Sequence, residues 1–208
     1  MLSHDNLTYA ALTNTEFFKW QFGEEIVLSY LPQNHVGGII MDFANIMCRG
    51  GVCCFADKNA LKGTLLENLQ YYKPTRFLGV TRVFEKIEEG IKSKGADTKG
   101  VKKLFVEWAK KQALNHHKQE ELGKSHSSFG YNLAKKFVFS KVHDGLGFTN
   151  TKNFIIGAAA VSPETVRFFL SLDMKLLEAI RIGRILKYEQ VLIVLDISKP
   201  KIIVNSIN

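Results

Sequence analysis

The order of apolar and polar positions predicts short strands that alternate with helices over most of the chain. Short apolar runs bounded by polar residues, proline or glycine are typical of buried strands. Such runs occupy residues 24–32, 52–56, 75–80 and 152–160. Strands that alternate with helices indicate an α/β fold, in which flanking helices cover a parallel or mixed sheet.

Apolar residues at helical spacing predict helices between these strands. The helices are expected over residues 6–20, 35–51, 63–74, 81–95, 100–122, 131–147 and 162–172. Ser3 suits the N-terminal cap of the first helix, and Gly50 suits the left-handed position that ends the second. Ser162 and Pro163 supply the last helix with a cap residue and a proline in its first turn.

The helix expected over residues 100–122 carries apolar residues and a pair of histidines. Leu104, Phe105, Trp108 and Leu114 lie along its apolar side. His116 and His117 each precede a glutamate by four residues, but the HExxH pattern of helical zinc sites is absent. This spacing without the motif predicts a solvated helix end.

Composition adds a basic charge to this picture. The 208 residues carry a formal net charge of +8, and many of the lysines lie between residues 86 and 111. The glutamates interspersed among them indicate solvated helix faces. A basic surface for nucleic acid or an anionic membrane is the other interpretation. The segment lacks interleaved aromatic residues and a nucleic-acid motif, so we expect no nucleic-acid partner.

The cysteines and the hydrophobic segments indicate the cellular compartment of the protein. Cys48, Cys53 and Cys54 have no paired CxxC spacing, which indicates reduced thiols and no zinc site. The first residues lack the pattern of a signal peptide, and no apolar run reaches the roughly 18 residues of a membrane span. We therefore expect a cytoplasmic protein without a transmembrane segment, whose association with the endoplasmic reticulum or another membrane would be peripheral.

Common catalytic and phosphate-binding motifs are incomplete along the chain. The serines at 125–128 lack a GxSxG elbow. Residues 95–101 begin like a P-loop without its Lys-Ser or Lys-Thr ending, and residues 145–150 lack the third glycine of a dinucleotide loop. Small residues after the strand near 157 would let a flat ligand approach the backbone, or would serve only a tight connection to the next helix. These residues alone leave both interpretations open.

Three segments carry a resemblance to a known family. SYLPQNHVGG at 29–38 is similar to a strand-to-helix element with the pattern LPL-x-H, and GVTRVFEK at 79–86 to the pattern GVPRVWEK. GAAAVSPETVRFFL at 157–170 is similar to the pattern GAAP…RFFL. Residues 1–178 thus resemble the long-chain acyl-CoA synthetases of the bubblegum type, within the adenylate-forming enzymes. The resemblance implies the N-terminal α/β domain of such an enzyme, with its sheet incomplete.

The resemblance also implies an activity and its ligands. Such enzymes join a fatty acid to ATP as an acyl-adenylate, release diphosphate, and transfer the acyl group to CoA. ATP, Mg²⁺ and CoA would be the cofactors of the full-length protein. A fatty acid or its acyl-adenylate would be the ligand bound by this chain.

The family's binding residues transfer to two groups of positions. The acyl pocket would be lined by His35, near the reacting carboxylate, and by Gly37, Gly38 and Ile39. The adenine and the acyl-adenylate would pack against Gly157, Ala158 and Ala159. Thr81 and Ala160 stand where the family has proline. No residue is assigned as catalytic or as a metal ligand.

Two motifs of the family are expected outside the matching segment. The glycine-rich phosphate loop would lie before Met1, and the sequence after Glu178 differs from the expected YG-x-(S/T)-E motif. We therefore expect a partial AMP-binding domain at residues 1–178 and a divergent tail at residues 179–208. This interpretation predicts part of a long-chain fatty acid–CoA ligase that is inactive by itself. The alternative is a non-catalytic module that binds acyl groups or a partner protein.

Overall fold

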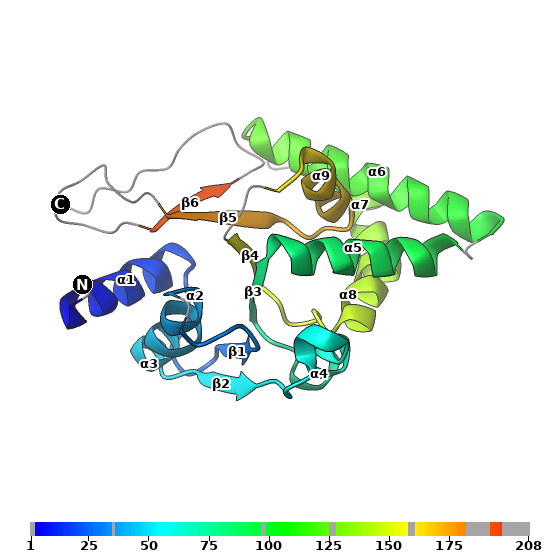
Figure 1. Ribbon diagram of the computed structural model, residues 1–208. Helices are drawn as coiled ribbons and strands as arrows, with labels where there is room; N and C mark the ends of the chain where they lie inside the picture. The colour runs from blue at the N-terminus through cyan, green and yellow to red at the C-terminus, as the bar shows by residue number, and fades with distance from the viewer. Residues whose placement is uncertain are drawn as a thin grey trace.

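The computed structural model describes residues 3–34, 36–96, 99–124, 128–157, 161–181 and 192–196. Within these ranges a six-stranded sheet has the strand order β2-β1-β3-β4-β5-β6 (Figure 1). Its parallel strands are β1 (Ile26–Ser29), β2 (Val52–Phe55), β3 (Arg76–Val80), β4 (Asn153–Gly157) and β5 (Leu176–Arg181). β6 (Leu192–Asp196) runs antiparallel to β5. The structure confirms the predicted α/β fold with a mixed sheet.

The register of the parallel strands brings their carboxyl ends to one edge of the sheet. β1 and β2 pair up to Ser29 opposite Phe55. β3 and β4 pair up to Val80 opposite Gly157. In open α/β sheets, ligands bind outside the carboxyl ends of the strands. This edge is therefore the place to look for a site.

Helices from the first part of the chain cover one face of the sheet (Figure 1). They are α1 (His4–Phe17), α2 (Val36–Gly38), the π-helix η1 (Ile39–Ala44) and α3 (Asn45–Arg49). Val27 and Ile155 of the sheet pack on this face against a cluster that includes Trp20, Met41 and Ile46. Because side chains alternate between the two faces of a strand, this cluster forms one half of the core.

The opposite face carries most of the remaining helices (Figure 1). They are η2 (Ala60–Lys62), α4 (Leu65–Tyr72), α5 (Thr81–Ala96), α8 (Ser140–Leu146) and α9 (Pro163–Ser171). Phe77 of β3 lies edge-on to Phe84 of α5 with ring centroids 5.6 Å apart, and Phe84 meets Phe169 of α9 at 5.4 Å. Such edge-to-face pairs add to the hydrophobic burial that fixes α5 and α9 on the sheet.

An outer layer consists of α6 (Val101–Glu121), α7 (Phe129–Ala134) and the π-helix η3 (Lys135–Phe139) (Figure 1). The buried residues of α6 are Ala109, Ala113 and His117, spaced four residues apart. The predicted apolar side of this helix is confirmed only in part, because Trp108 packs against the core of this layer whereas Leu104 and Phe105 are exposed. Ala109 and Ala113 lie in one buried cluster with Tyr131, Ala134 and Phe139, so the small side chains of α6 accommodate the larger ones of α7 and η3.

His117 was also predicted wrongly, since it is buried and does not lie at a solvated helix end. Its Nε2 lies 3.0 Å from Asp173 Oδ1, which also accepts a hydrogen bond from the Tyr131 hydroxyl at 2.9 Å. Burial opposes ionisation of Asp173, but these two hydrogen bonds hold its pKa below the usual value. The three side chains join α6 and α7 to the turn that follows α9.

The sequence signals for helix ends are confirmed at several positions. Ser3 Oγ accepts the N–H of Asn6 at 3.2 Å, and Asn6 Oδ1 accepts the N–H of Ser3 at 3.0 Å. Gly50 ends α3 in the left-handed conformation with φ +62°, and Ser162 Oγ caps α9 at the N–H of Thr165. The helix expected over 35–51 differs in one respect, because η1 interrupts its α-helical hydrogen bonding with π-helical turns.

Candidate functional site

The binding positions expected from the sequence lie near the carboxyl edge of the sheet where the structure describes them. Gly37 and Gly38 belong to α2, which begins shortly after β1 ends, and Ile39 opens η1. Gly157 is the last residue of β4. The predicted positions His35, Ala158 and Ala159 lie outside the described residues.

The surroundings of Gly38 and Gly157 differ in the space that a side chain would have at each position. A Cβ on Gly38 would lie 3.1 Å from the Pro32 carbonyl oxygen, so glycine lets the start of α2 pack tightly on the preceding turn. A Cβ on Gly157 would have no atom of the described residues within 4 Å. The backbone at the end of β4 therefore faces open space among the described residues, as a flat ligand would require.

The segment that resembles GVPRVWEK is positioned by packing at the end of β3. A Cβ on Gly79 would lie 2.7 Å from the Phe84 ring, so only glycine lets the first turn of α5 close onto the strand. Thr81 is the first residue of α5. Arg82 is exposed and pairs with Glu85 at 3.3 Å. The segment is thus a tight strand-to-helix connection at the same edge as Gly157.

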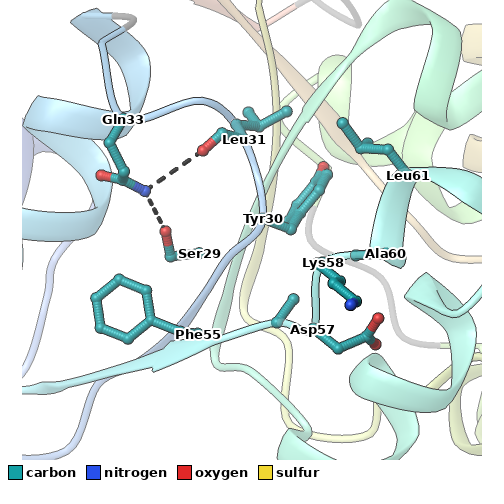
Figure 2. A pocket seen from close by; sticks show the side chains of 10 residues that line it. Ser29, Tyr30, Leu31, Gln33, Phe55, Asp57, Lys58, Ala60 and Leu61 are labelled. Atoms are coloured by element: carbon teal, nitrogen blue, oxygen red, sulfur yellow. Dashed lines mark hydrogen bonds between the residues drawn. The ribbon is translucent and has the colours of Figure 1, made fainter.

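A pocket of about 260 Å³ lies at the carboxyl ends of β1 and β2 (Figure 2). Its lining residues are Ser29, Tyr30, Leu31, Gln33, Phe55, Ala56, Asp57, Lys58, Ala60 and Leu61. Tyr30 forms part of its base: the ring stacks on Phe77 and the hydroxyl donates to the Leu78 carbonyl at 2.7 Å. The walls combine apolar side chains with a few polar groups, and none of the predicted binding positions Gly37, Gly38, Ile39 and Gly157 lines this pocket.

A buried polar network supports the wall of this pocket. Asp42 of η1 is only 5% exposed, and its carboxylate accepts hydrogen bonds from Ser29 and Gln33. Burial raises the pKa of Asp42, although both hydrogen bonds oppose that change. Sequence reasoning missed these residues. The available signal was a lone carboxylate in the apolar segment 39–46, where a buried acid needs partners.

The cysteines near this network are not activated nucleophiles. Burial, together with the charge of Asp42, raises the pKa of the Cys53 thiol to about 11. Burial also raises the pKa of Cys54. All three cysteines are free thiols. Among the residues that the structure describes, no group of three or more His, Cys, Asp or Glu side chains could hold a metal ion.

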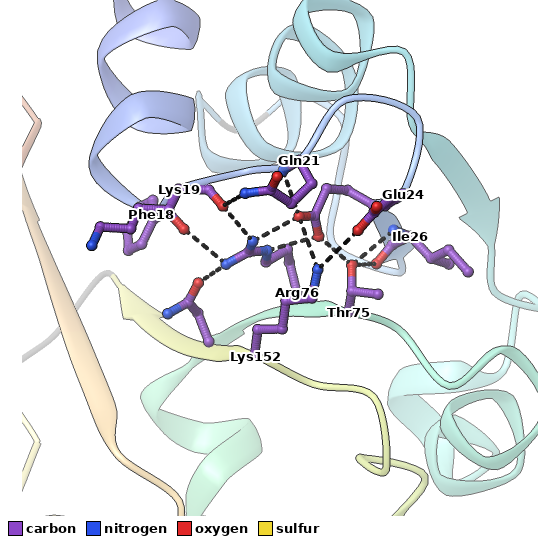
Figure 3. A network of polar contacts seen from close by, with 10 residues as sticks. Phe18, Lys19, Gln21, Glu24, Ile26, Thr75, Arg76 and Lys152 are labelled. Atoms are coloured by element: carbon purple, nitrogen blue, oxygen red, sulfur yellow. Dashed lines mark hydrogen bonds and ion pairs between the residues drawn. The ribbon is translucent and has the colours of Figure 1, made fainter.

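A second polar network lies at the opposite, amino edge of the sheet (Figure 3). Arg76 at the start of β3 pairs with Glu25, the residue before β1, and both side chains are buried. Thr75 donates to Glu25 at 2.6 Å, and the N–H of Gln21 donates at 2.9 Å. Arg76 also hydrogen-bonds to Asn153 and lies 5.5 Å from the centre of the Trp20 ring.

The Glu25 carboxylate is strongly stabilised in its charged form. Burial is the largest single influence and raises its pKa, but hydrogen bonds from Arg76, Thr75 and Gln21, with the charge of Arg76, lower it to about 2. Every oxygen of the carboxylate has a partner. The network is therefore saturated and fixes the strands, whereas the carboxyl edge offers open space.

A mostly parallel sheet covered by helices on both faces, with glycine turns at its carboxyl edge, defines an α/β domain of the open-sheet class. The sequence matches the family model described as AMP-binding enzyme over residues 1–179, and the chain therefore belongs to this family. The match confirms the resemblance to adenylate-forming enzymes.

Curated relatives make the resemblance more specific. The chain is 41% identical over 174 residues to long-chain-fatty-acid–CoA ligase ACSBG2 of Homo sapiens, covering 84% of this chain and 26% of the relative. It is 38% identical to ACSBG2 of Gallus gallus, covering 86% and 24%, and 36% identical to the ligase heimdall of Drosophila melanogaster, covering 85% and 26%. The chain thus spans about a quarter of the length of these relatives.

Solved structures share the fold at lower sequence identity. The adenylation domain of a keto acid-selecting NRPS module, bound to keto acyl adenylate, matches with a TM-score of 0.52 and 18% identity over 85% of this chain and 25% of that one. McyG A-PCP complexed with phenylalanyl-adenylate matches with a TM-score of 0.52 and 15% identity over 86% and 22%. These similarities support the α/β adenylation fold alone.

Proposed function

We propose that the protein contributes the acyl-binding part of an AMP-forming long-chain fatty acid–CoA ligase. The observation that carries this proposal is the 36–41% identity to such ligases over about 85% of the chain. The carboxyl edge of the sheet supports it, because α2 and the end of β4 both border this edge. An acyl group would lie against Gly37, Gly38 and Ile39, and the adenine and acyl-adenylate against Gly157.

The proposed reaction is the two-step activation of a fatty acid. The fatty carboxylate attacks the α-phosphate of ATP and releases diphosphate; the CoA thiol then attacks the acyl carbonyl and releases AMP. The role of this chain would be to hold the acyl group and the adenine in position, which lowers the entropy cost of reaction. The described residues offer no cluster for Mg²⁺, so no step is assigned to a metal here.

The division into a family domain at residues 1–178 and a divergent tail at 179–208 belongs to the same proposal. β5 continues across this boundary to Arg181 and pairs with β6. We propose cytoplasmic location with peripheral membrane association, since fatty acids partition into bilayers. No helix in the described parts of the chain is long and apolar enough to span a membrane.

Titration of the purified 208-residue chain with BODIPY-labelled palmitate tests the binding role. We expect saturable binding that Gly157→Leu weakens about tenfold or more, which corresponds to ~1.4 kcal/mol of binding free energy. Gly145→Leu is the matched control, because a Cβ on Gly145 also has no described atom within 4 Å but lies in α8. Equal affinity of both variants, or no binding by the unmodified chain, would contradict the proposal.

An activity assay with palmitate, Mg-ATP and CoA tests the prediction that this chain is inactive by itself. We expect the 208-residue chain to form no acyl-CoA by itself. Binding without turnover would agree with an acyl-binding role for this chain. Turnover would overturn the prediction of inactivity while supporting the proposed ligase chemistry.

A further inference from the structure

The side chains of Ser29, Gln33 and Asp42 form the polar network beside the pocket, and Gln33 takes part in it through its amide nitrogen only. Gln33 Nε2 lies 3.3 Å from Asp42 Oδ2 and 3.4 Å from the Leu31 carbonyl oxygen, and it also donates to Ser29 Oγ. Ser29 in turn hydrogen-bonds to Asp42. Figure 2 shows Gln33, Ser29 and Leu31 together on one side of the pocket. A single carboxylate in η1 thus holds the turn that follows β1.

The carboxylate determines which way the Gln33 amide points. An ionised carboxylate only accepts hydrogen bonds, so the amide nitrogen must face Asp42 and the amide oxygen must face away. That oxygen lies 3.6 Å from where a Cβ of Gly38 would be. It is buried and has no hydrogen-bond partner among the described residues. The hydrogen bonds that hold the Gln33 amide in this orientation among the described residues are therefore those of its nitrogen.

The π-helix brings Asp42 into this position. η1 spans Ile39–Ala44 directly after the short α2, and π-helical turns contain one more residue than α-helical turns. Asp42 is buried beneath the turn, while Phe43 beside it is 36% exposed. Such π-segments often lie at functional sites. The π-helix therefore places Asp42 where its hydrogen bonds can hold the pocket wall at Ser29 and Gln33.

We propose that Asp42 is a positioning residue that acts through Gln33 and Ser29 on the turn between β1 and α2, the turn that leads to the proposed acyl positions Gly37 and Gly38. Asp42 contacts Ser29 and Gln33 directly and reaches the Leu31 carbonyl through Gln33. All three of these residues line the pocket. The same turn packs through Pro32 against Gly38. Asp42 itself touches no ligand in this proposal. The expected effect of Asp42 on acyl binding rests on the proposed function, whereas its stabilisation of the turn does not depend on that function.

Hydrogen–deuterium exchange of the full chain, without ligand, tests the positioning role. We expect Asp42→Asn and Gln33→Glu each to speed exchange in residues 30–38 about tenfold, the effect of losing one charge-assisted hydrogen bond. Gln33→Glu places two carboxylates in contact. The double variant reverses donor and acceptor, since the amide introduced at position 42 can donate to the carboxylate introduced at position 33. It should return exchange to within about twofold of the unmodified chain.

Asp144→Asn is the control for the chemical change, since Asp144 of α8 also accepts a hydrogen bond, from Thr149, but lies away from the turn. It should leave exchange in 30–38 unchanged. If Gln33→Glu fails to fold, Asp42→Ala and Ser29→Ala decide the question, because each removes a side-chain oxygen that accepts from Gln33 without adding charge. Unchanged exchange in these variants, or additive effects in the double variant, would overturn the proposal.

Affinity for BODIPY-labelled palmitate provides the second readout. Asp42→Asn should weaken binding about tenfold while the thermal midpoint of unfolding stays near that of the unmodified chain, and the double variant should recover affinity. A general loss of structure would instead lower the midpoint and would not be rescued. Absence of probe binding by the unmodified chain would contradict the proposed function, and exchange would still decide the role of Asp42.

Discussion

The Arg76 guanidinium donates two parallel hydrogen bonds to the Glu25 carboxylate, with Nε 2.8 Å from Oε2 and Nη2 2.7 Å from Oε1. The pair joins the residue before β1 to the first residue of β3, which are neighbours in the sheet but 51 residues apart in the chain. Two-pronged pairs of this kind are among the strongest protein hydrogen bonds. The alignment of the central strands depends on this contact.

Replacing Arg76 with Met should destabilise the fold strongly. The change leaves the Glu25 carboxylate buried without its cation, which costs about 3–5 kcal/mol in comparable cases. Urea unfolding measures the effect. Lys152→Met is the control: Lys152 also pairs with Glu25 at 3.5 Å, but its side chain is 44% exposed, so about 0–1 kcal/mol should be lost. Similar losses in the two variants would contradict the buried pair's structural role.

The low pKa of Glu25 predicts a specific pH dependence of stability. Its folded pKa of about 2 lies below the value near 4.3 of an unfolded glutamate, so between these values the unfolded state binds more protons. The stabilisation is present above the unfolded pKa and is lost as pH falls through the folded pKa. The free energy of unfolding should therefore fall less steeply between about pH 5 and 2 in Glu25→Gln. Parallel curves for the two proteins would refute this assignment.

Alanine substitutions at two glycines near the end of α8 should change the free energy of unfolding in opposite directions. Gly147 has φ +77°, and a Cβ there would overlap the Leu69 carbonyl carbon. Gly147→Ala should cost more than ~2 kcal/mol, because it combines backbone strain with a backbone clash. Gly145 lies inside α8 with open space around it, so Gly145→Ala should stabilise by about 0.5–1 kcal/mol. Chemical denaturation of the two variants provides the comparison.

Cys53 should react slowly with alkylating reagents in the folded protein. With a pKa near 11, its thiolate fraction at pH 8 is lower by about two orders of magnitude than that of an ordinary cysteine. Iodoacetamide labelling followed by peptide mass spectrometry gives the rate at each cysteine. Labelling in urea supplies the unperturbed rate. A rate in the folded state equal to that in urea would disprove the raised pKa.

The strands and helix ends could be read from the sequence because they depend on local patterns. The apolar run at β3 and the capping residues Ser3 and Ser162 act within a few residues of chain, and the structure confirms them. The family was also recognisable, since its motifs are contiguous. The roles of the predicted site residues stay predictions, and His35 lies outside the described residues.

The errors and omissions share a physical cause, which is dependence on tertiary contacts. Hydrophobicity favoured Leu104 as a buried residue of α6, but the neighbouring helix packs on the small Ala109 and Ala113. No local pattern connects Glu25 to Arg76, or Gln33 to a carboxylate nine residues later. Such polar pairs become visible only when the chain has brought their elements together.

The π-helix η1 also affects how related chains should be aligned. A π-turn holds one residue more than an α-turn. Deleting one residue within 39–44 would therefore restore regular α-helical hydrogen bonding and would not interrupt the helix. Length differences among relatives at this point would then be evolutionary insertions inside a helix. A relative shorter by one residue here would place its next acidic side chain about 100° around the helix axis, and would need another residue to anchor the turn.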